Sequence, residues 1–140
     1  MMGRIEFRMG KVMVSVLALV FSTELAAQAI GFKQSLAQNT VLERSIARFY
    51  RARDYRSFWI GPTAQERARL QALITAFSDA DMHGLPKARF NAEVMVSKLR
   101  AADSQGALGK LEAELTKAFL DYARSVRSGL LIPSEVDEEI

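Results

Sequence analysis

The chain carries one histidine and no cysteine, so few of its residues could do chemistry. His83 lies four residues after Asp79, and on a helix this spacing places both side chains on one face. Such a pair can supply two metal ligands, but a protein metal site needs a third and usually a fourth. No further ligand is evident, so we predict no metal site. We interpret His83 as a structural residue in the last turn of a helix, where it interacts favourably with the helix dipole.

The remaining titratable groups do not assemble a catalytic set. The carboxylate pairs Asp79/Asp81 and Glu112/Glu114 are two residues apart, and side chains two apart on a helix do not face one another. The sequence contains no glycine-rich phosphate loop, no G-x-S-x-G and no H-E-x-x-H. Because nucleophile, base and orienting group cannot all be nominated, we predict no catalytic residue and no cofactor-binding residue in this chain. A periplasmic enzyme that uses His83 is a third possibility.

Three arginines form the most distinct charged pattern. Arg44, Arg48 and Arg51 are spaced i, i+4, i+7 and therefore share the outer face of a predicted helix. They form either a solvated face of an amphipathic helix or a surface that faces an anion, such as lipid headgroups, cell-wall carboxylates or an acidic neighbouring domain. The formal net charge is only +3, which disfavours a nucleic-acid partner.

The first 29 residues have the three-part pattern of a secretory signal peptide. A basic start precedes a ten-residue apolar run at 12–21, and Ala27-Gln28-Ala29 fits the small-x-small cleavage pattern. The apolar run is too short to span a bilayer, which takes about 20 residues. We therefore expect export to the periplasm, with only transient membrane contact through the signal peptide. The sequence offers three possible starts: Met1, Met2 and Met9.

The rest of the chain is predicted to be all-α, a small bundle of about four helices. We expect a flexible lead-in at 30–39 and a helical domain at 40–132. Capping boxes at Thr40/Glu43 and Thr63/Glu66 predict the first two helix starts. Gly84 is predicted to adopt a left-handed conformation after the second helix.

Two more helices are expected, followed by a truncated segment. Asn91 is predicted to cap the third helix, and the fourth carries a long apolar stripe from Leu108 to Val126 and ends at Gly129. Part of that stripe is expected to lack a cover. Residues 133–140 look like the start of a following segment, so we expect the chain to be part of a longer protein.

The stretch "FYRARDYRSFW" at 49–59 places several aromatic rings at the exit of the first helix, where large rings most often close a core. Its order of motifs resembles the N-terminal scaffold region of murein L,D-transpeptidases of the YcbB type. That pattern has an aromatic pair, A-R-x-Y, a tryptophan, an A-x-x-H-G-L-like turn, and then a tyrosine, a glycine and a proline. The matching residues are Phe49, Tyr50, Arg53, Tyr55, Trp59, His83, Gly84, Leu85, Tyr122, Gly129 and Pro133.

The resemblance implies a non-catalytic helical scaffold beside a domain that forms 3→3 peptidoglycan cross-links in cell-wall biogenesis. In the family that domain uses a cysteine in an S-x-G-C motif, which this chain lacks. The parent protein would be an L,D-transpeptidase, an acyl transferase. The implied partners are the missing catalytic and peptidoglycan-binding domains of the same polypeptide, and peptidoglycan itself. The alternative is a free-standing helical binding protein of the envelope.

Overall fold

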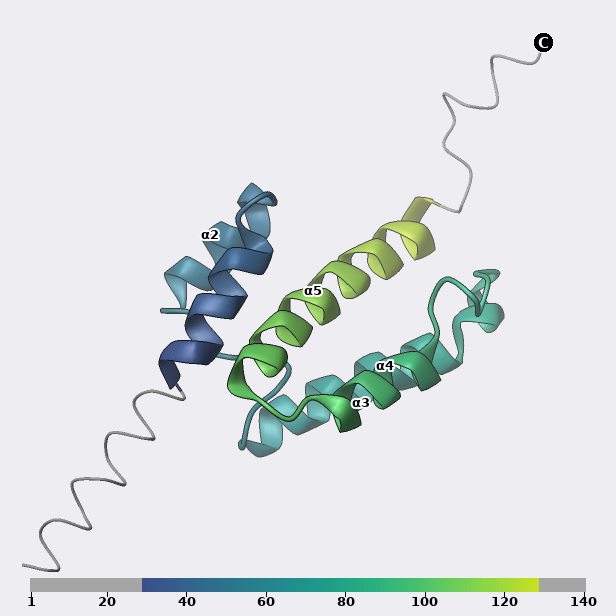
Figure 1. Cartoon of the computed structure of the whole chain (residues 1–140). Helices are drawn as coiled ribbons and strands as arrows, with labels where there is room; N and C mark the ends of the chain where they lie inside the picture. Colours follow the sequence, from purple (N-terminus) through teal and green to yellow (C-terminus); the bar gives the residue numbers. More distant parts are fainter. Residues whose placement is uncertain (1–28, 129–140) are drawn as a thin grey trace, which may run out of the picture.

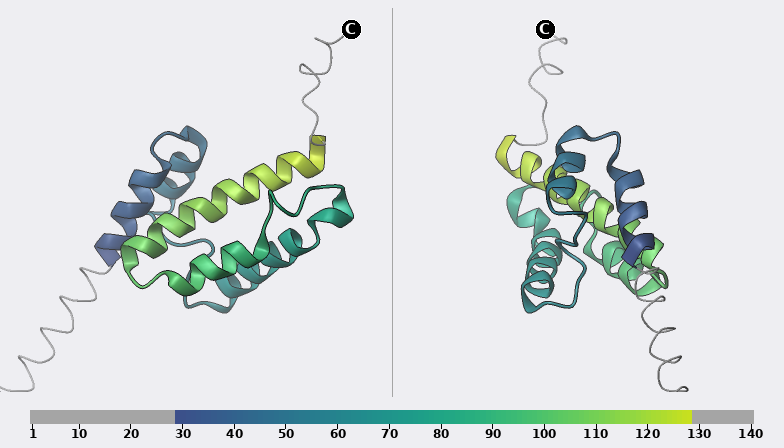
Figure 2. Two further views of the ribbon diagram at one scale, coloured as in Figure 1. Left: turned by 45° about the vertical axis from the view of Figure 1, so that its right-hand side comes forward. Right: turned by 90° about the vertical axis from the view of Figure 1, so that its left-hand side faces the viewer.

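The structure is a computed structural model, and it describes residues 29–128. Within that range the regular elements are helical, and the prediction of an all-α fold is confirmed. The elements are a helical segment at 29–40, α2 (Arg44–Ala52), α3 (Ala64–Ser78), a 3₁₀ turn η1 (Ala80–His83), α4 (Ala92–Ala101) and α5 (Gln105–Ser128). Figures 1 and 2 show α5 in the middle, with the 29–40 helix and α2 on one side and α3 and α4 on the other.

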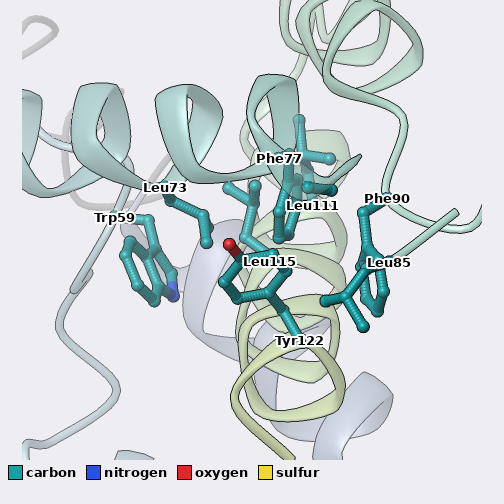
Figure 3. Close-up of a cluster of buried hydrophobic side chains, with 9 residues drawn as sticks. Trp59, Leu73, Phe77, Leu85, Phe90, Leu111, Leu115 and Tyr122 are labelled. Carbon is teal, nitrogen blue, oxygen red and sulfur yellow. The ribbon is translucent and has the colours of Figure 1, made fainter. Parts of the chain in front are cut away.

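The central position of α5 follows from its residue pattern, which is apolar on more than one face. Leu111, Leu115 and Tyr122 fall at helical spacing and are buried in a cluster with α3 and the loops around it. Ala113 points elsewhere and joins a second buried cluster with Leu36, Ile46 and Tyr50. Figure 3 shows Leu73 and Phe77 of α3 pointing toward α5, with Trp59 at one end of the cluster.

The expected flexible lead-in at 30–39 is wrong, because residues 29–40 are helical and packed. Leu36 is completely buried in the second cluster, and Phe32, one turn before it, packs against the same cluster. Close packing on α5 is possible because residue 109 is glycine. A Cβ at Gly109 would meet the backbone oxygen of Phe32 at a distance shorter than real Cβ contacts allow.

The capping box predicted at Thr40/Glu43 is also wrong. The Thr40 hydroxyl donates back to the carbonyls of Leu36 and Ala37, at 2.9 and 3.2 Å, so Thr40 ends one helix instead of starting the next. Helix α2 begins at Arg44 after Glu43, which makes no side-chain cap. Leu42 is 93% exposed in the turn between the helices.

The other local predictions agree with the structure. Thr63 and Glu66 form a complete capping box at the start of α3, and Asn91 accepts from the amide of Val94 at 2.9 Å. Gly84 has φ +71°, the left-handed conformation predicted for it, after the short turn η1. The proposed signal peptide (apart from Ala29), the helix end at Gly129 and the segment 133–140 lie outside the described residues.

Candidate functional site: a buried carboxylate network and two exposed surfaces

The most unusual feature of the interior is the carboxylate of Glu112 on α5, which is completely buried. Its Oε1 accepts from the Tyr50 hydroxyl at 2.8 Å and from the amide of Phe58 at 2.6 Å. Its Oε2 accepts from the amide of Ile60 at 2.9 Å, and the amide of Trp59 lies 3.1 and 3.3 Å from the two oxygens. One side chain thus satisfies three successive backbone donors that have no helix or sheet partner.

Thr116, one turn further along α5, extends the network. Its hydroxyl oxygen lies 2.6 Å from the Tyr50 hydroxyl and accepts from the indole nitrogen of Trp59 at 2.9 Å. It donates in turn to the backbone oxygen of Glu112 at 3.1 Å. Burial raises the pKa of Tyr50 well above its ordinary value, and the nearby Glu112 carboxylate raises it further, so Tyr50 stays a neutral donor.

A second carboxylate, Glu66 on α3, bonds to both ends of the segment 57–63, which joins the Glu112 network to α3. It accepts from the hydroxyl of Ser57 at 2.5 Å and from the amide and hydroxyl of Thr63 at 3.0 and 2.6 Å. The hydrogen bonds from Ser57 and then Thr63 lower the pKa of Glu66 below its ordinary value. A Cβ at Gly61 would overlap this carboxylate, so glycine makes the approach possible.

The oxygens of both carboxylates accept hydrogen bonds from donors of this chain. These bonds fix the 53–62 loop between α2, α3 and α5, and the loop residue Trp59 is buried against α5. From the sequence, Glu112 was considered only together with Glu114, as a pair too poorly placed for catalysis, and Glu66 was predicted only to cap a helix. The signal for Glu112 was its place among the apolar residues Leu108, Leu111 and Leu115, where a carboxylate is out of pattern unless it is bonded.

The three arginines predicted to share one helix face lie together on the surface of α2. Arg44, Arg48 and Arg51 are all exposed on α2 and line one shallow depression together with Ser45 and Val41. The ion pairs found among residues 29–128 involve other basic side chains. The arrangement leaves three guanidinium groups on one face of one helix, which suits an anionic partner.

Beside this surface lies an apolar hollow, here called the aromatic groove. The residues that line it come from α2, the 53–62 loop and α5: Ser45, Ile46, Phe49, Phe58, Trp59, Thr116, Phe119 and Leu120. The hollow has a volume of about 270 Å³. A second apolar hollow of about 350 Å³ continues on the other side of the Trp59–Phe119 pair, toward α3.

The first family-motif residues, from Phe49 to Tyr55, contact one another and the 53–62 loop. Tyr50 belongs to the network, and Phe49 packs edge-on against Tyr50 and Phe58 with ring centroids 5.0 and 5.5 Å apart. The Arg53 guanidinium lies over both phenylalanine rings and donates to a loop carbonyl. Tyr55 has φ +51° and its amide donates to the Tyr50 carbonyl at 2.8 Å, which ends α2 sharply.

The later motif residues close the opposite end of the core. Leu85 is buried after the left-handed Gly84, and exposed His83 places its ring edge-on to buried Tyr122, centroids 6.4 Å apart. His83 and Asp79 are not brought together with further ligands: residues 29–128 contain no group of three or more side chains that could hold a metal ion. Gly129 and Pro133 lie outside the described residues. None of the described helices is long and apolar enough to cross a membrane.

The fold and the network define a helical structural domain, in which the buried polar groups fasten helices to a loop. A family model described as Scaffold domain matches residues 44–140, and the chain belongs to that family. No curated protein and no solved structure matches the chain.

Proposed function

We propose that this chain is the non-catalytic helical scaffold of a periplasmic murein L,D-transpeptidase and supports the domain that forms 3→3 cross-links. The observation that carries this proposal is the family match over residues 44–140. The ordered motifs quoted from the sequence resemble those of the YcbB-type murein L,D-transpeptidase scaffold and support the choice of this type.

The interior supports a scaffold role in physical terms. Buried, fully bonded carboxylates hold the 53–62 loop in one arrangement, and the aromatic residues of that loop fix α2 and α3 to α5. A polar network with all members satisfied favours a single packing over its alternatives. A rigid frame of this kind suits a domain whose task is to position another.

The surface supports a contact through α2. Arg44, Arg48 and Arg51 offer three exposed positive charges on one helix face. An acidic face of the catalytic domain is the partner that we favour, since a scaffold must bind what it positions. Such a charge array gives orientation and specificity more than raw affinity.

The signal-peptide pattern supports a site of action in the periplasm. Cleavage after Ala29 would release a mature chain that begins at Ile30 and keeps Leu36, which the second buried cluster needs. The periplasm is the compartment in which murein is cross-linked, so export and the scaffold role agree.

Site-specific photo-cross-linking in cells tests the partner. A cross-linking residue at Arg48 is expected to capture peptides of the domain that carries an S-x-G-C catalytic motif. The matched control is Arg100, an exposed arginine on α4, from which that product should be absent. Products to murein alone would favour a free-standing envelope binding protein, and equal products from both positions would contradict a role for α2.

A further inference from the structure

The aromatic groove is an apolar surface with a charged border. Phe49 and Phe119 on its walls are each 39% exposed, and Val126, two turns further along α5, is 47% exposed. Ser45 lines both the groove and the arginine depression, so the two hollows adjoin at Ser45, next to Arg44 in the chain. Arg124 and Arg127 are exposed on the last turns of α5. The best occupant is therefore a short segment with apolar side chains and acidic neighbours.

Residues 129–140 of this chain have that composition. Val136 and Ile140 are four apart, a spacing that places both on one side of a helix, and Glu135, Asp137, Glu138 and Glu139 surround them. The family match runs through residue 140, so these residues belong to the same domain as α2 to α5. A domain normally buries the apolar residues of its own segments on its own uncovered surface.

The chain is long enough to make this contact. Leu120 and Ser128 are eight residues apart on α5, which is about 12 Å along a helix. Gly129 and Pro133 favour an end to α5 and a change of direction. The seven residues Ser134–Ile140 would extend about 10 Å if helical, so Ile140 can come back to the level of Leu120.

We propose that residues 134–140 dock antiparallel to α5 at the aromatic groove. Ile140 enters it between Phe49 and Phe119, Val136 packs one turn further along α5 toward Val126, and the acidic residues face Arg44 and the arginines at the end of α5. This inference does not rest on the proposed transpeptidase function, since it concerns only the packing of the domain itself.

Thiol accessibility tests the docking cleanly, because the chain has no cysteine of its own. Ser45→Cys places one exposed thiol among the residues that line the groove, and Ser78→Cys places a matched exposed thiol at the far end of α3. Modification of Cys at position 45 should be about ten-fold slower in the full chain than in a chain ending at Ser128, as expected if the docked form outnumbers the open form about ten to one. Modification at position 78 should not differ between the two chains.

A full-chain variant with Val136→Asp and Ile140→Asp should lose the protection at position 45 while circular dichroism shows the helices intact. Equal rates in the full and shortened chains would overturn the proposal. If the thiol at position 45 stays protected in the chain ending at Ser128, residues 12–21 would be the segment that covers the groove. If its protection grows with protein concentration, a second copy of the chain would cover the groove. Either result also overturns the proposal.

Discussion

Replacing Glu112 by glutamine exchanges one carboxylate oxygen for an amide group and leaves the side-chain size almost unchanged. If the amide oxygen takes the place of Oε1, the bonds from Tyr50 and Phe58 survive. The new NH₂ group then faces the amide of Ile60, which lies 2.9 Å from Oε2, so two donors meet with no acceptor.

The expected loss follows from the number of unsatisfied donors. A buried donor without a partner costs about 1–3 kcal/mol, so the two created here should lower the free energy of unfolding by about 3 kcal/mol. For a domain of this size that corresponds to a fall in Tm of roughly 10–20 °C. Glu112→Leu leaves all three backbone amides of the loop unsatisfied, and we expect a larger loss than for the glutamine variant.

Urea unfolding followed by the fluorescence of Trp59, the only tryptophan, measures these losses, because its indole is bonded to Thr116 in the same network. The matched control is Glu114→Gln on the same helix. Glu114 pairs with Lys98 at 2.7 Å near the surface, and such pairs contribute no more than about 1 kcal/mol. A Glu112→Leu variant as stable as the wild type would refute the reasoning, because desolvation of the charge would then outweigh the hydrogen bonds.

Three further predictions follow from other parts of the structure. Gly109→Ala should lower the free energy of unfolding by about 1–3 kcal/mol in thermal melts, because its Cβ would meet the Phe32 backbone. The control Gly106→Ala, whose Cβ meets nothing, should be neutral or slightly stabilising. Equal effects of the two substitutions would contradict close packing of the 29–40 helix on α5. The pKa of Glu66 is lowered in the folded state, so the stability that its charge contributes is full above the ordinary pKa of 4.5 and is lost as the pH falls through the folded pKa. The difference in unfolding free energy between wild type and Glu66→Gln should therefore shrink in urea titrations below pH 4.5. A difference that stays constant would argue against a lowered pKa of Glu66. N-terminal sequencing of the exported protein should begin at Ile30, and a product that keeps residues 1–29 would exclude the predicted cleavage.

The fold class could be predicted from the sequence because helical periodicity and caps are local signals. The turn at Gly84 and the caps at Thr63 and Asn91 depend on residues within four positions of one another. Thr40 shows the limit of such signals. The same Ser/Thr-x-x-Glu pattern occurs there, but the helix that precedes it supplies carbonyl acceptors for the hydroxyl, and a pattern of four residues does not report what comes before.

The buried network could not be derived in the same way, because it joins residues more than 50 positions apart. The sequence shows that Glu112 lies among leucines, but not which donors would reach it. The arginine surface was predictable as one face of one helix, since three residues at i, i+4, i+7 need no tertiary information. Its partner is a separate matter, and the cross-linking experiment above addresses it.

The fraction of 3→3 cross-links among muropeptides tests most directly the proposal that this domain serves murein L,D-transpeptidation. In the organism that carries this chain, removing its coding sequence should lower that fraction, and restoring it should recover the original value. Restoration with Glu in place of Arg44, Arg48 and Arg51 should recover less, while the same reversal at the exposed Arg67, Arg100 and Lys110 should recover fully. An unchanged 3→3 fraction after removal would contradict the account.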